Sequence, residues 1–165
     1  MTSIVIPFCL EDGDYVLSFF DTNNNSMIGG NYKLQDLEGN LYVCGGLYND
    51  QQISTFSTEV FNDLIEVTFQ LTLDTYPGET TWAIFDVSVS PAVELFSGGP
   101  FVDPDDDFAI LTYNLCLEPG SYDVLVNDAY GDGITDGGFT VTVGNTEVVN
   151  SIVNGTGSSA TFTVD

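Results

Sequence analysis

Ile65-Glu-Val-Thr-Phe-Gln-Leu-Thr-Leu73 alternates strictly between apolar and polar side chains along its whole length. Every odd-numbered residue in it is apolar, and every even-numbered residue is polar. Successive side chains of a β-strand point to opposite faces of a sheet, so this period of two predicts a strand buried on one face. No segment of useful length shows the 3.6-residue period of an amphipathic helix.

Similar alternation occurs on both sides of this stretch. Further predicted strands cover residues 15–20, 32–37, 41–44, 82–89, 122–126, 139–143 and 160–164. Turn signals separate them at residues 39–40, 76–78, 98–100, 118–120 and 144–145. Many short strands with turns at this spacing predict an all-β fold, an antiparallel β-sandwich or jelly roll.

An internal repeat, incomplete in its first copy, relates the two ends of the chain. Residues 9–32 (CLEDGDYVLSFFDTNNNSMIGGNY) align without a gap with residues 116–139 (CLEPGSYDVLVNDAYGDGITDGGF), at an offset of 107 positions (116 − 9). Only the second copy follows a long strand-like region, residues 64–113. We interpret the chain as a half-module (residues 1–60) and a complete module (residues 61–165). A half-module cannot close a core alone, so it must pack on the other copy or on another chain.

The charge balance excludes several classes of partner. The chain has 25 acidic residues against one basic residue, Lys33, and a formal net charge of −24. Nothing could neutralise the phosphates of a nucleic acid or an anionic membrane surface. No apolar run is long enough for membrane insertion. Two interpretations of the acidity stay open: a solvated surface adapted to saline water, and carboxylates that bind cations.

The same composition argues against an enzyme. Without histidine and with a single lysine, nucleophile–base pairs of the Ser–His or Cys–His kind cannot be built. Paired carboxylates could serve a glycosidase, but any pair can be chosen from 25 acids, so the pattern carries no signal.

Cys9, Cys44 and Cys116 make an odd count, with no CxxC motif and no histidine, which argues against a zinc site. We expect one disulfide and one remaining thiol, with Cys9–Cys44 joining the two ends of the half-module. Cys9 and Cys116 occupy equivalent repeat positions, so one of them could instead bridge to a different chain. The alternative is three buried thiols that pack as small apolar residues.

The loop from residue 128 to residue 136 has the spacing of a calcium loop. Asp128, Asp132 and Asp136 fall at positions 1, 5 and 9, and Gly133 falls at position 6, as in an EF-hand. Calcium prefers six to eight oxygen ligands, and residues two apart on a tight loop can turn their oxygens inward together. The pattern predicts a Ca²⁺ site.

This loop also departs from the EF-hand pattern. Tyr130, at position 3, and Ile134, at position 7, can offer only backbone carbonyl oxygens, and Phe139 replaces the bidentate acid at position 12. Any final ligand must come from elsewhere in the fold. The alternative is an Asp/Gly-rich turn that binds no ion, and the three spaced acids favour calcium over it.

The matching loop of the first copy keeps oxygen donors but fewer charges. Its candidate ligands are Asp21, Asn23, Asn25 and the carbonyl of Met27. Ligand charge tunes calcium affinity, so we expect weaker binding here than at the second loop. An asparagine-rich loop that tolerates left-handed backbone is an equal alternative.

A third acidic patch contains Asp103, Asp105 and Asp107. Such closely spaced carboxylates repel one another unless they are neutralised. The patch is interpreted either as a cap on another ion or as a solvated turn, and we favour the ion.

Three motifs in order carry a resemblance to a known module. They are Asp74-Thr-Tyr-Pro-Gly-Glu79-Thr-Thr-Trp82, Cys116-Leu-Glu-Pro-Gly-Ser-Tyr122 and Asp128-Ala-Tyr-Gly-Asp132-Gly-Ile134. Residues 65–164 thereby resemble the calcium-loop β-sandwich module (D-x-Y-P-x-E-T-x-W, C-L-x-x-G-x-Y, D-x-x-G-D-G-I) of large extracellular proteins of marine bacteria and microalgae.

The resemblance implies an extracellular, calcium-stabilised β-sandwich without a catalytic role. It makes Asp74 and Glu79 candidate partners of the Asp128 loop. Members of the family often carry a cysteine where this chain has Thr135, so a disulfide from Cys116 into that loop is absent here.

Two functional hypotheses follow from these patterns. In the first, the chain is a structural subunit, and its apolar segment Thr2–Ile6 inserts into the next copy to give a head-to-tail homopolymer at the cell surface. The alternative for that segment is the first strand of the chain's own sandwich. In the second hypothesis, the chain is a calcium-dependent adhesion or carbohydrate-binding module that binds a polysaccharide.

Overall fold

A computed structural model describes residues 4–7, 9–20, 30–47, 51–58 and 64–165 of the chain. In this part of the chain nearly all regular structure is antiparallel β-strand, so the all-β prediction is confirmed. The one helical segment described is the short 3-10 helix η1 (Pro77–Glu79). No described helix has the length and apolar character needed to cross a membrane. The strands are β1 (Asp14–Phe20), β2 (Gly30–Gln35), β3 (Leu41–Leu47), β4 (Gln51–Ser57), β5 (Ile65–Thr72), β6 (Thr80–Asp86), β7 (Val93–Gly98), β8 (Ile110–Leu117), β9 (Gly120–Asp128), β10 (Gly138–Val143), β11 (Thr146–Ser151) and β12 (Gly157–Val164).

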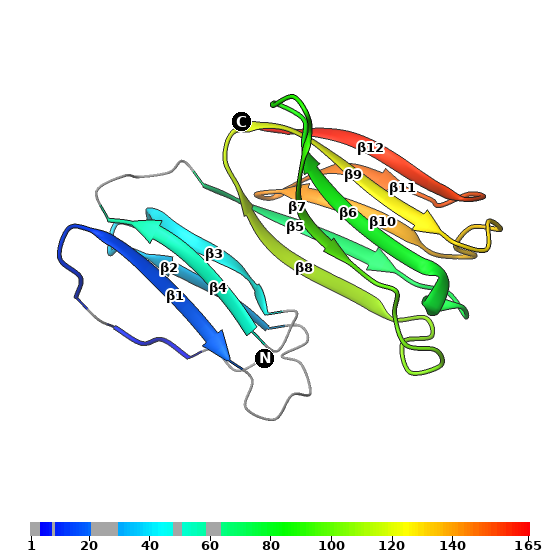
Figure 1. Ribbon diagram of the computed structural model, residues 1–165, viewed down its shortest axis with the longest axis horizontal. Coiled ribbons are helices and arrows are strands. Elements are labelled where there is room, and N and C mark those ends of the chain that lie inside the picture. The colour runs from blue at the N-terminus through cyan, green and yellow to red at the C-terminus, as the bar shows by residue number, and fades with distance from the viewer. Residues whose placement is uncertain (1–3, 8, 21–29, 48–50, 59–63) are drawn as a thin grey trace.

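Strands β5 to β12 form a two-layer β-sandwich (Figure 1). One four-stranded sheet has the order β11-β10-β5-β8, and the other has the order β12-β9-β6-β7. β5 is the alternating stretch that the sequence predicts as a half-buried strand. Its Val67, Phe69 and Leu71 have no exposed surface, whereas the even-numbered residues between them face away from the core.

Aromatic rings fill the centre of this sandwich. The ring of Phe69 lies 4.7 Å from that of Trp82, 5.8 Å from that of Tyr113 and 6.2 Å from that of Phe139, measured between centroids. These residues belong to β5, β6, β8 and β10, so one cluster joins both sheets. Aromatic pairs at such separations, in tilted or stacked geometry, stabilise the core beyond the burial of their apolar surface.

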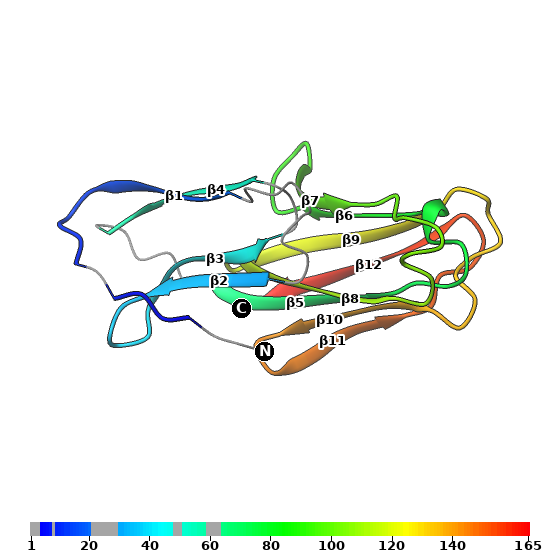
Figure 2. The ribbon, with the colours of Figure 1, turned by 90° about the horizontal axis from the view of Figure 1, so that it is seen from below.

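The half-module forms a smaller two-layer unit beside the sandwich. β1 pairs with β4 in one layer and β2 pairs with β3 in the other, and the two layers lie over each other in Figure 2. Side chains from the two layers contact each other. The ring centroids of Phe19 and Tyr32 are 4.6 Å apart, and the Tyr32 hydroxyl is hydrogen-bonded to the hydroxyl of Ser54 at 2.6 Å.

The four strands of the half-module repeat the pairing of the last four strands of the chain. At the sequence offset of 107 (116 − 9), β1 and β2 fall on β9 and β10, and β3 and β4 follow as the equivalents of β11 and β12. The pairs β1–β4 and β2–β3 match the pairs β9–β12 and β10–β11. The register of the β2–β3 pair shifts between Leu34 and Gln35, and that of the β10–β11 pair shifts between Val141 and Thr142, the equivalent repeat positions. The count of one and a half modules remains our interpretation of this pattern.

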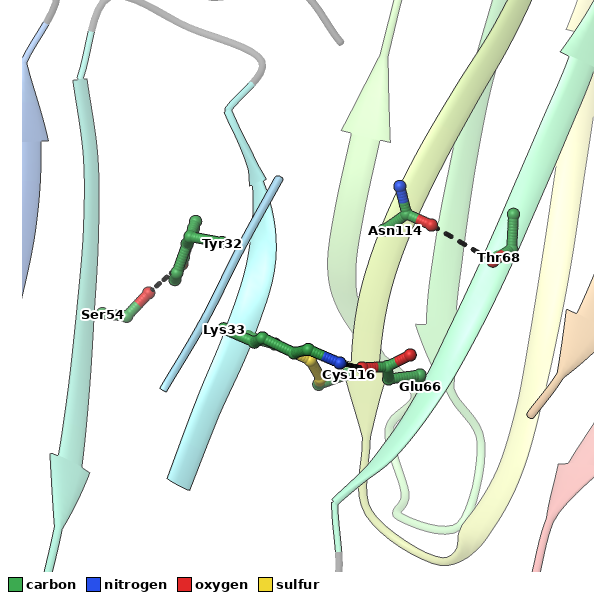
Figure 3. Close-up of a disulfide and its surroundings, with 8 residues drawn as sticks. Tyr32, Lys33, Ser54, Glu66, Thr68, Asn114 and Cys116 are labelled. Atoms are coloured by element: carbon green, nitrogen blue, oxygen red, sulfur yellow. Dashed lines mark hydrogen bonds and ion pairs between the residues drawn. A yellow bond between two sulfur atoms is a disulfide. The ribbon is translucent and has the colours of Figure 1, made fainter. Parts of the chain in front are cut away.

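A disulfide joins the half-module to the sandwich. Cys44 of β3 is bonded to Cys116 of β8, and Lys33 of β2 forms a 2.8 Å ion pair with Glu66 of β5 beside it (Figure 3). In the strand registers Lys33 lies opposite Cys44, and Glu66 lies opposite Cys116. The four residues therefore form one row across the junction.

The prediction that Cys9 pairs with Cys44 is wrong, although the structure does have one disulfide and one free thiol, as expected. Cys9 is exposed and unbonded. β3 lies alongside β8, so the closest cysteine to Cys44 comes from the complete module and not from the half-module. Sequence spacing alone does not reveal this tertiary neighbour.

The apolar N-terminal segment does not add a strand to the chain's own sheets where the structure describes it. Residues 4–7 have no strand assignment, and Ile4, Val5 and Ile6 are 81%, 85% and 70% exposed. Thr2 and Ser3 lie outside the described residues. The alternative that Ile4–Ile6 starts the chain's own sandwich is therefore not what the structure has, whereas insertion into a neighbour stays a prediction.

Candidate metal site

The pairing of β6 with β9 brings two acidic residues together at one end of the sandwich. Thr80, the first residue of β6, lies opposite Asp128, the last residue of β9. Glu79 precedes Thr80 at the end of η1, and its carbonyl accepts a 2.9 Å hydrogen bond from the Ala129 N–H. Glu79 and Asp128 are thus neighbours across two strand ends that lie about fifty positions apart in the sequence.

Asp132 completes a group of three carboxylates. One carboxylate oxygen from each of Glu79, Asp128 and Asp132 lies within 4.8 Å of those of the other two. Asp128 is buried, Glu79 is half-buried and Asp132 is exposed. The group therefore has one fixed member at its base and two members that face solvent. We call these three residues the carboxylate cluster.

Asp128 also organises the loop that follows it. Its Oδ1 accepts hydrogen bonds from the backbone N–H groups of Tyr130 (2.8 Å) and Gly131 (3.0 Å). Its Oδ2 accepts a 2.5 Å hydrogen bond from the N–H of Gly133. A carboxylate has about four lone-pair positions, so three donors leave room for a cation contact as well.

Gly133 is required by the path of this loop. Its φ is +84°, in the left-handed region that glycine adopts without strain, and a Cβ added there would lie 2.5 Å from the carbonyl oxygen of Val153. The next residue, Ile134, donates its N–H to that same carbonyl at 3.1 Å. The loop is therefore held tightly against the turn between β11 and β12.

The pKa values of the cluster reflect its crowded negative charge. Desolvation raises the pKa of Glu79 above its ordinary value, and the charges of Asp128 and Asp132 raise it further. Burial alone would raise the pKa of Asp128, but hydrogen bonds from the N–H groups of Gly131, Tyr130 and Gly133 outweigh it and lower that pKa. Asp128 is thus held as a carboxylate, whereas ionisation of Glu79 is opposed.

No side chain of the protein can neutralise this cluster. Lys33 is the single basic residue in the sequence, and its ammonium group is engaged with Glu66 at 2.8 Å, at the junction with the half-module. The cluster can reduce its repulsion only by binding protons or by binding a cation from solution.

Asp74, a partner suggested by the resemblance, has a different role in the structure. Its side chain is 8% exposed, and its two carboxylate oxygens accept hydrogen bonds from the N–H groups of Tyr76 (2.8 Å) and Thr135 (3.0 Å). It ties the loop after β5 to the loop after β9. It supports the position of the cluster without being one of the three grouped carboxylates.

The other predicted ligands of this loop lie around the cluster. Tyr130 is 77% exposed, and Ile134 is buried in the core. The Ile134 carbonyl accepts a hydrogen bond from Gly137 at 3.3 Å. Asp136 is exposed, with a φ of 57°, and does not belong to the three grouped carboxylates. The roles of these residues as ligands stay predictions.

The third acidic patch lies at the same end of the sandwich, in the loop before β8 (Figure 1). Burial raises the pKa of Asp107, and the charges of Asp103, Asp105 and Asp74 add to the rise. Oδ1 of Asp107 is buried without a hydrogen-bond partner among the described residues. The Phe108 N–H donates to the Asp74 carbonyl at 2.9 Å, which connects this loop to the support of the cluster.

The candidate ligands of the first copy are not placed. Asp21, Asn23, Asn25 and Met27 lie outside the described residues, so the weaker calcium site expected there stays a prediction.

The turn between β11 and β12 is a contributor that sequence reasoning missed. Besides the Val153 contact, the Thr156 carbonyl accepts a 3.1 Å hydrogen bond from the Asp128 N–H. This turn has no acidic residue, and its signals are the dipeptide Asn154-Gly155 and Gly157. Those glycines predict a turn, but they do not predict that it lies under the loop after β9.

Comparisons of the chain with protein-family models, with curated proteins and with solved structures find no match. The resemblance to the calcium-loop module therefore stays a prediction that rests on the three quoted motifs.

Proposed function

We propose that this protein is a non-enzymatic, extracellular, calcium-binding β-sandwich protein that serves as a structural subunit of a filament or surface layer. The carboxylate cluster is the observation that carries the proposal. It gathers the oxygen donors that calcium prefers from two loops, at a place where the chain offers no neutralising side chain.

A bound calcium ion would act as a clip between two connections of the sandwich. Glu79 belongs to the connection from β5 to β6, and Asp132 belongs to the connection from β9 to β10. Three carboxylates are fewer ligands than calcium takes, so backbone carbonyls and water would complete the shell. An ion that binds the folded chain and not the unfolded chain stabilises the fold by mass action.

Two further observations support a structural role outside the cell. The Cys44–Cys116 disulfide is compatible with an oxidising compartment, where such bonds persist. β1 and β2 each pair with only one strand among the described residues, which leaves an unpaired edge in each layer of the half-module. Unpaired edges of this kind accept strands from other molecules.

Negative-stain microscopy and thermal melting of the same sample test the proposal. With calcium we expect assemblies larger than a monomer and a higher melting temperature than in EGTA. Magnesium at the same concentration is the control, because its strict octahedral preference suits this open group of carboxylates less well than calcium does.

Either half of the proposal can fail separately. Equal melting temperatures in calcium and EGTA would overturn the calcium site. Discrete monomers at high concentration with calcium would overturn the assembly role, even if calcium still raised the melting temperature.

A polysaccharide-binding module is the second candidate, favoured by two exposed tyrosines in the loops that hold the cluster. Tyr76 is 57% exposed and Tyr130 is 77% exposed. Exposed aromatic rings can stack on sugar faces. Calcium-dependent retention on a polysaccharide column that is lost in Tyr130→Ala, by a protein that stays monomeric, would favour this candidate over the structural one.

A further inference from the structure

The turn between β11 and β12 carries an asparagine that the carboxylate cluster does not use. It contains Asn154-Gly155-Thr156, which has the N-x-[ST] spacing of an acceptor for N-linked sugar. The sequence has one further motif of this kind, Asn24-Asn25-Ser26, which lies outside the described residues. Three residues of this spacing occur often by chance, so the surroundings of Asn154 decide whether the motif can be used.

Both side chains that define the motif are exposed. Val153 is 2% exposed and anchors the turn in the core, and the chain then leads outward, so that Asn154 and Thr156 are exposed. The turn lies at the end of the sandwich that is remote from the half-module (Figure 1). N-linked sugar is bulky and hydrophilic and requires a surface position of this kind.

The amide of Asn154 is also available for reaction. Among the described residues, no hydrogen bond engages this amide or the hydroxyl of Thr156. Asn150, an exposed asparagine of β11, differs in this respect, because its amide donates a 3.1 Å hydrogen bond to the Glu147 carboxylate. Reaction at the Asn154 side chain would therefore break no contact that holds the fold.

Backbone groups alone fix the position of this turn. The Val153 carbonyl accepts a hydrogen bond from the Ile134 N–H, and the Thr156 carbonyl accepts one from the Asp128 N–H, both at 3.1 Å. Gly155 has a φ of 58°, which glycine adopts without strain. A sugar attached to the Asn154 side chain leaves all of these features intact.

We propose that Asn154 is an acceptor site for N-linked glycosylation, with a lipid-linked oligosaccharyl pyrophosphate as the donor. The proposal rests on the extracellular location proposed above, because the transferase acts on chains that are exported. Transfer forms a bond between Nδ2 of Asn154 and C1 of the first sugar, and it breaks the bond between C1 and the pyrophosphate oxygen. The lipid pyrophosphate leaves, and Nδ2 loses one proton.

The position of the sugar is compatible with the proposed assembly. The unpaired edges of β1 and β2 belong to the half-module, whereas the turn that carries Asn154 is at the other end of the molecule (Figure 1). Contacts through those edges would leave the sugar in solvent. We therefore expect the same assemblies with calcium from glycosylated wild type and from Asn154→Gln.

Secretion of the full chain from a eukaryotic cell line, behind a cleavable signal sequence, tests the site. Cleavage after glutamate releases residues 148–165, a peptide that contains a single N-x-[ST] motif. We expect sugar on this peptide in most wild-type molecules. Mass spectrometry detects it, because peptide N-glycosidase converts a glycosylated Asn154 into aspartate.

Two pairs of variants separate the motif from its surroundings. Thr156→Ala should remove the sugar although Asn154 remains, and Thr156→Ser should keep it, because serine supplies the required hydroxyl. Asn154→Gln should remove the sugar, whereas Asn150→Gln should keep it, because Asn150 is exposed but outside the motif. Thr156→Ala retains the backbone carbonyl that binds the Asp128 N–H, so its melting temperature should match that of Asn154→Gln.

Several outcomes would overturn the proposal. One is a wild-type peptide without sugar from cells that glycosylate a reference protein secreted alongside it, and another is sugar that persists in Thr156→Ala. Assemblies that form from Asn154→Gln but not from glycosylated wild type would overturn the placement of the sugar away from the contact.

Melting curves of the same material in calcium and in EGTA keep this proposal separate from the proposed function. A calcium-induced rise in melting temperature in a wild-type protein without sugar would overturn the acceptor site alone. Sugar on a protein whose melting temperature does not respond to calcium would support the acceptor site and overturn the calcium site.

Discussion

Tyr15 and Tyr122, 107 positions apart (122 − 15), make the same contacts in the two copies of the repeat. Tyr15 stacks on Phe56 at 5.5 Å, and Tyr122 stacks on Phe162 at 5.6 Å. Each hydroxyl donates a 2.8 Å hydrogen bond to the carbonyl of the glutamate four residues earlier. The half-module therefore reproduces the local packing of the complete module, although its core is less covered.

The first prediction follows from the deeper burial of Tyr122 than of Tyr15. Tyr122→Phe leaves the Glu118 carbonyl without its donor in a partly buried setting, and should lower the free energy of unfolding by about 1 kcal/mol. Tyr15→Phe should cost less than half as much, because the hydrogen bond of Tyr15 to the Glu11 carbonyl is exposed and water can replace the hydroxyl there. Chemical denaturation measures both, and equal losses would show that the two sites are equally covered.

Removing one exposed carboxylate should abolish the calcium response without unfolding the protein. Asp132→Asn should change the calcium-free stability by less than about 0.5 kcal/mol, since the residue is exposed. It should remove most of the calcium-induced rise in melting temperature. Asp36→Asn is the matched control, because Asp36 lies in the β2–β3 turn and is not part of the carboxylate cluster. There its carboxylate accepts hydrogen bonds from the backbone N–H and the side-chain amide of Asn40 (2.8 and 2.6 Å). A full calcium response in Asp132→Asn would exclude it as a ligand.

The pH dependence of stability should expose the repulsion at Glu79. Its pKa in the folded protein lies above its ordinary value of 4.5, chiefly through desolvation, so the folded state holds this proton more tightly than the unfolded state does. Without calcium, the contribution of this group to stability is therefore lost as the pH rises from its unfolded pKa through its raised folded pKa.

Glu79→Gln isolates that contribution. Without calcium the variant should be more stable than the wild type at neutral pH and equal to it below pH 4.5. With calcium the order should reverse, because the variant loses a ligand. Melting curves across the pH range in EGTA and in calcium provide the measurement. A variant that is less stable than the wild type in EGTA at neutral pH would contradict the prediction.

Gly133 should tolerate no side chain. Gly133→Ala combines a φ of +84° with a Cβ placed 2.5 Å from the Val153 carbonyl, and should cost about 2 kcal/mol or more. Gly144→Ala is the control: its φ is +57°, but its Cβ would meet nothing within 4 Å. It should therefore show only the backbone strain, about 1 kcal/mol. Similar losses in the two variants would mean that the loop moves away freely from the turn after β11.

The junction disulfide should stabilise the chain by restricting its unfolded state. Cys44 and Cys116 are 72 positions apart, and closing a loop of that size is worth roughly 2–4 kcal/mol. Cys44→Ser should lose this amount in chemical denaturation, whereas Cys9→Ser should not change stability, because Cys9 is exposed and unbonded. A loss in Cys9→Ser as large as that in Cys44→Ser would contradict this pairing.

Local patterns in the sequence predict the strands with the clearest alternation. β5 is recognised because all its apolar residues point into one core, and β9 and β10 are recognised for the same reason. β4, β7, β8 and β11 are not among the predicted strands, and in β4 and β11 the apolar residues are too few to show a period of two. The repeat was visible because Tyr15 and its equivalents make side-chain contacts that need particular residue types.

Contacts between distant segments were harder to predict. The Asp128 loop was found from its spacing, but Glu79 was identified only through the resemblance, because a strand pairing brings it to Asp128. Asp74 was expected beside the ion, yet its oxygens bind backbone N–H groups, which no residue pattern specifies. The partner of Cys44 likewise depends on β3 lying beside β8.

The disulfide at the junction also determines how the protein responds to mechanical force. Tension applied to the two ends of the chain passes from Cys44 directly to Cys116, 72 positions later, and bypasses the segment between them. That segment includes the strands β4 to β7 and, fully extended, would span about 250 Å. Stretching the oxidised protein should leave this length hidden, and a reductant should release it, so the redox state of one bond sets how far the molecule can extend before it breaks.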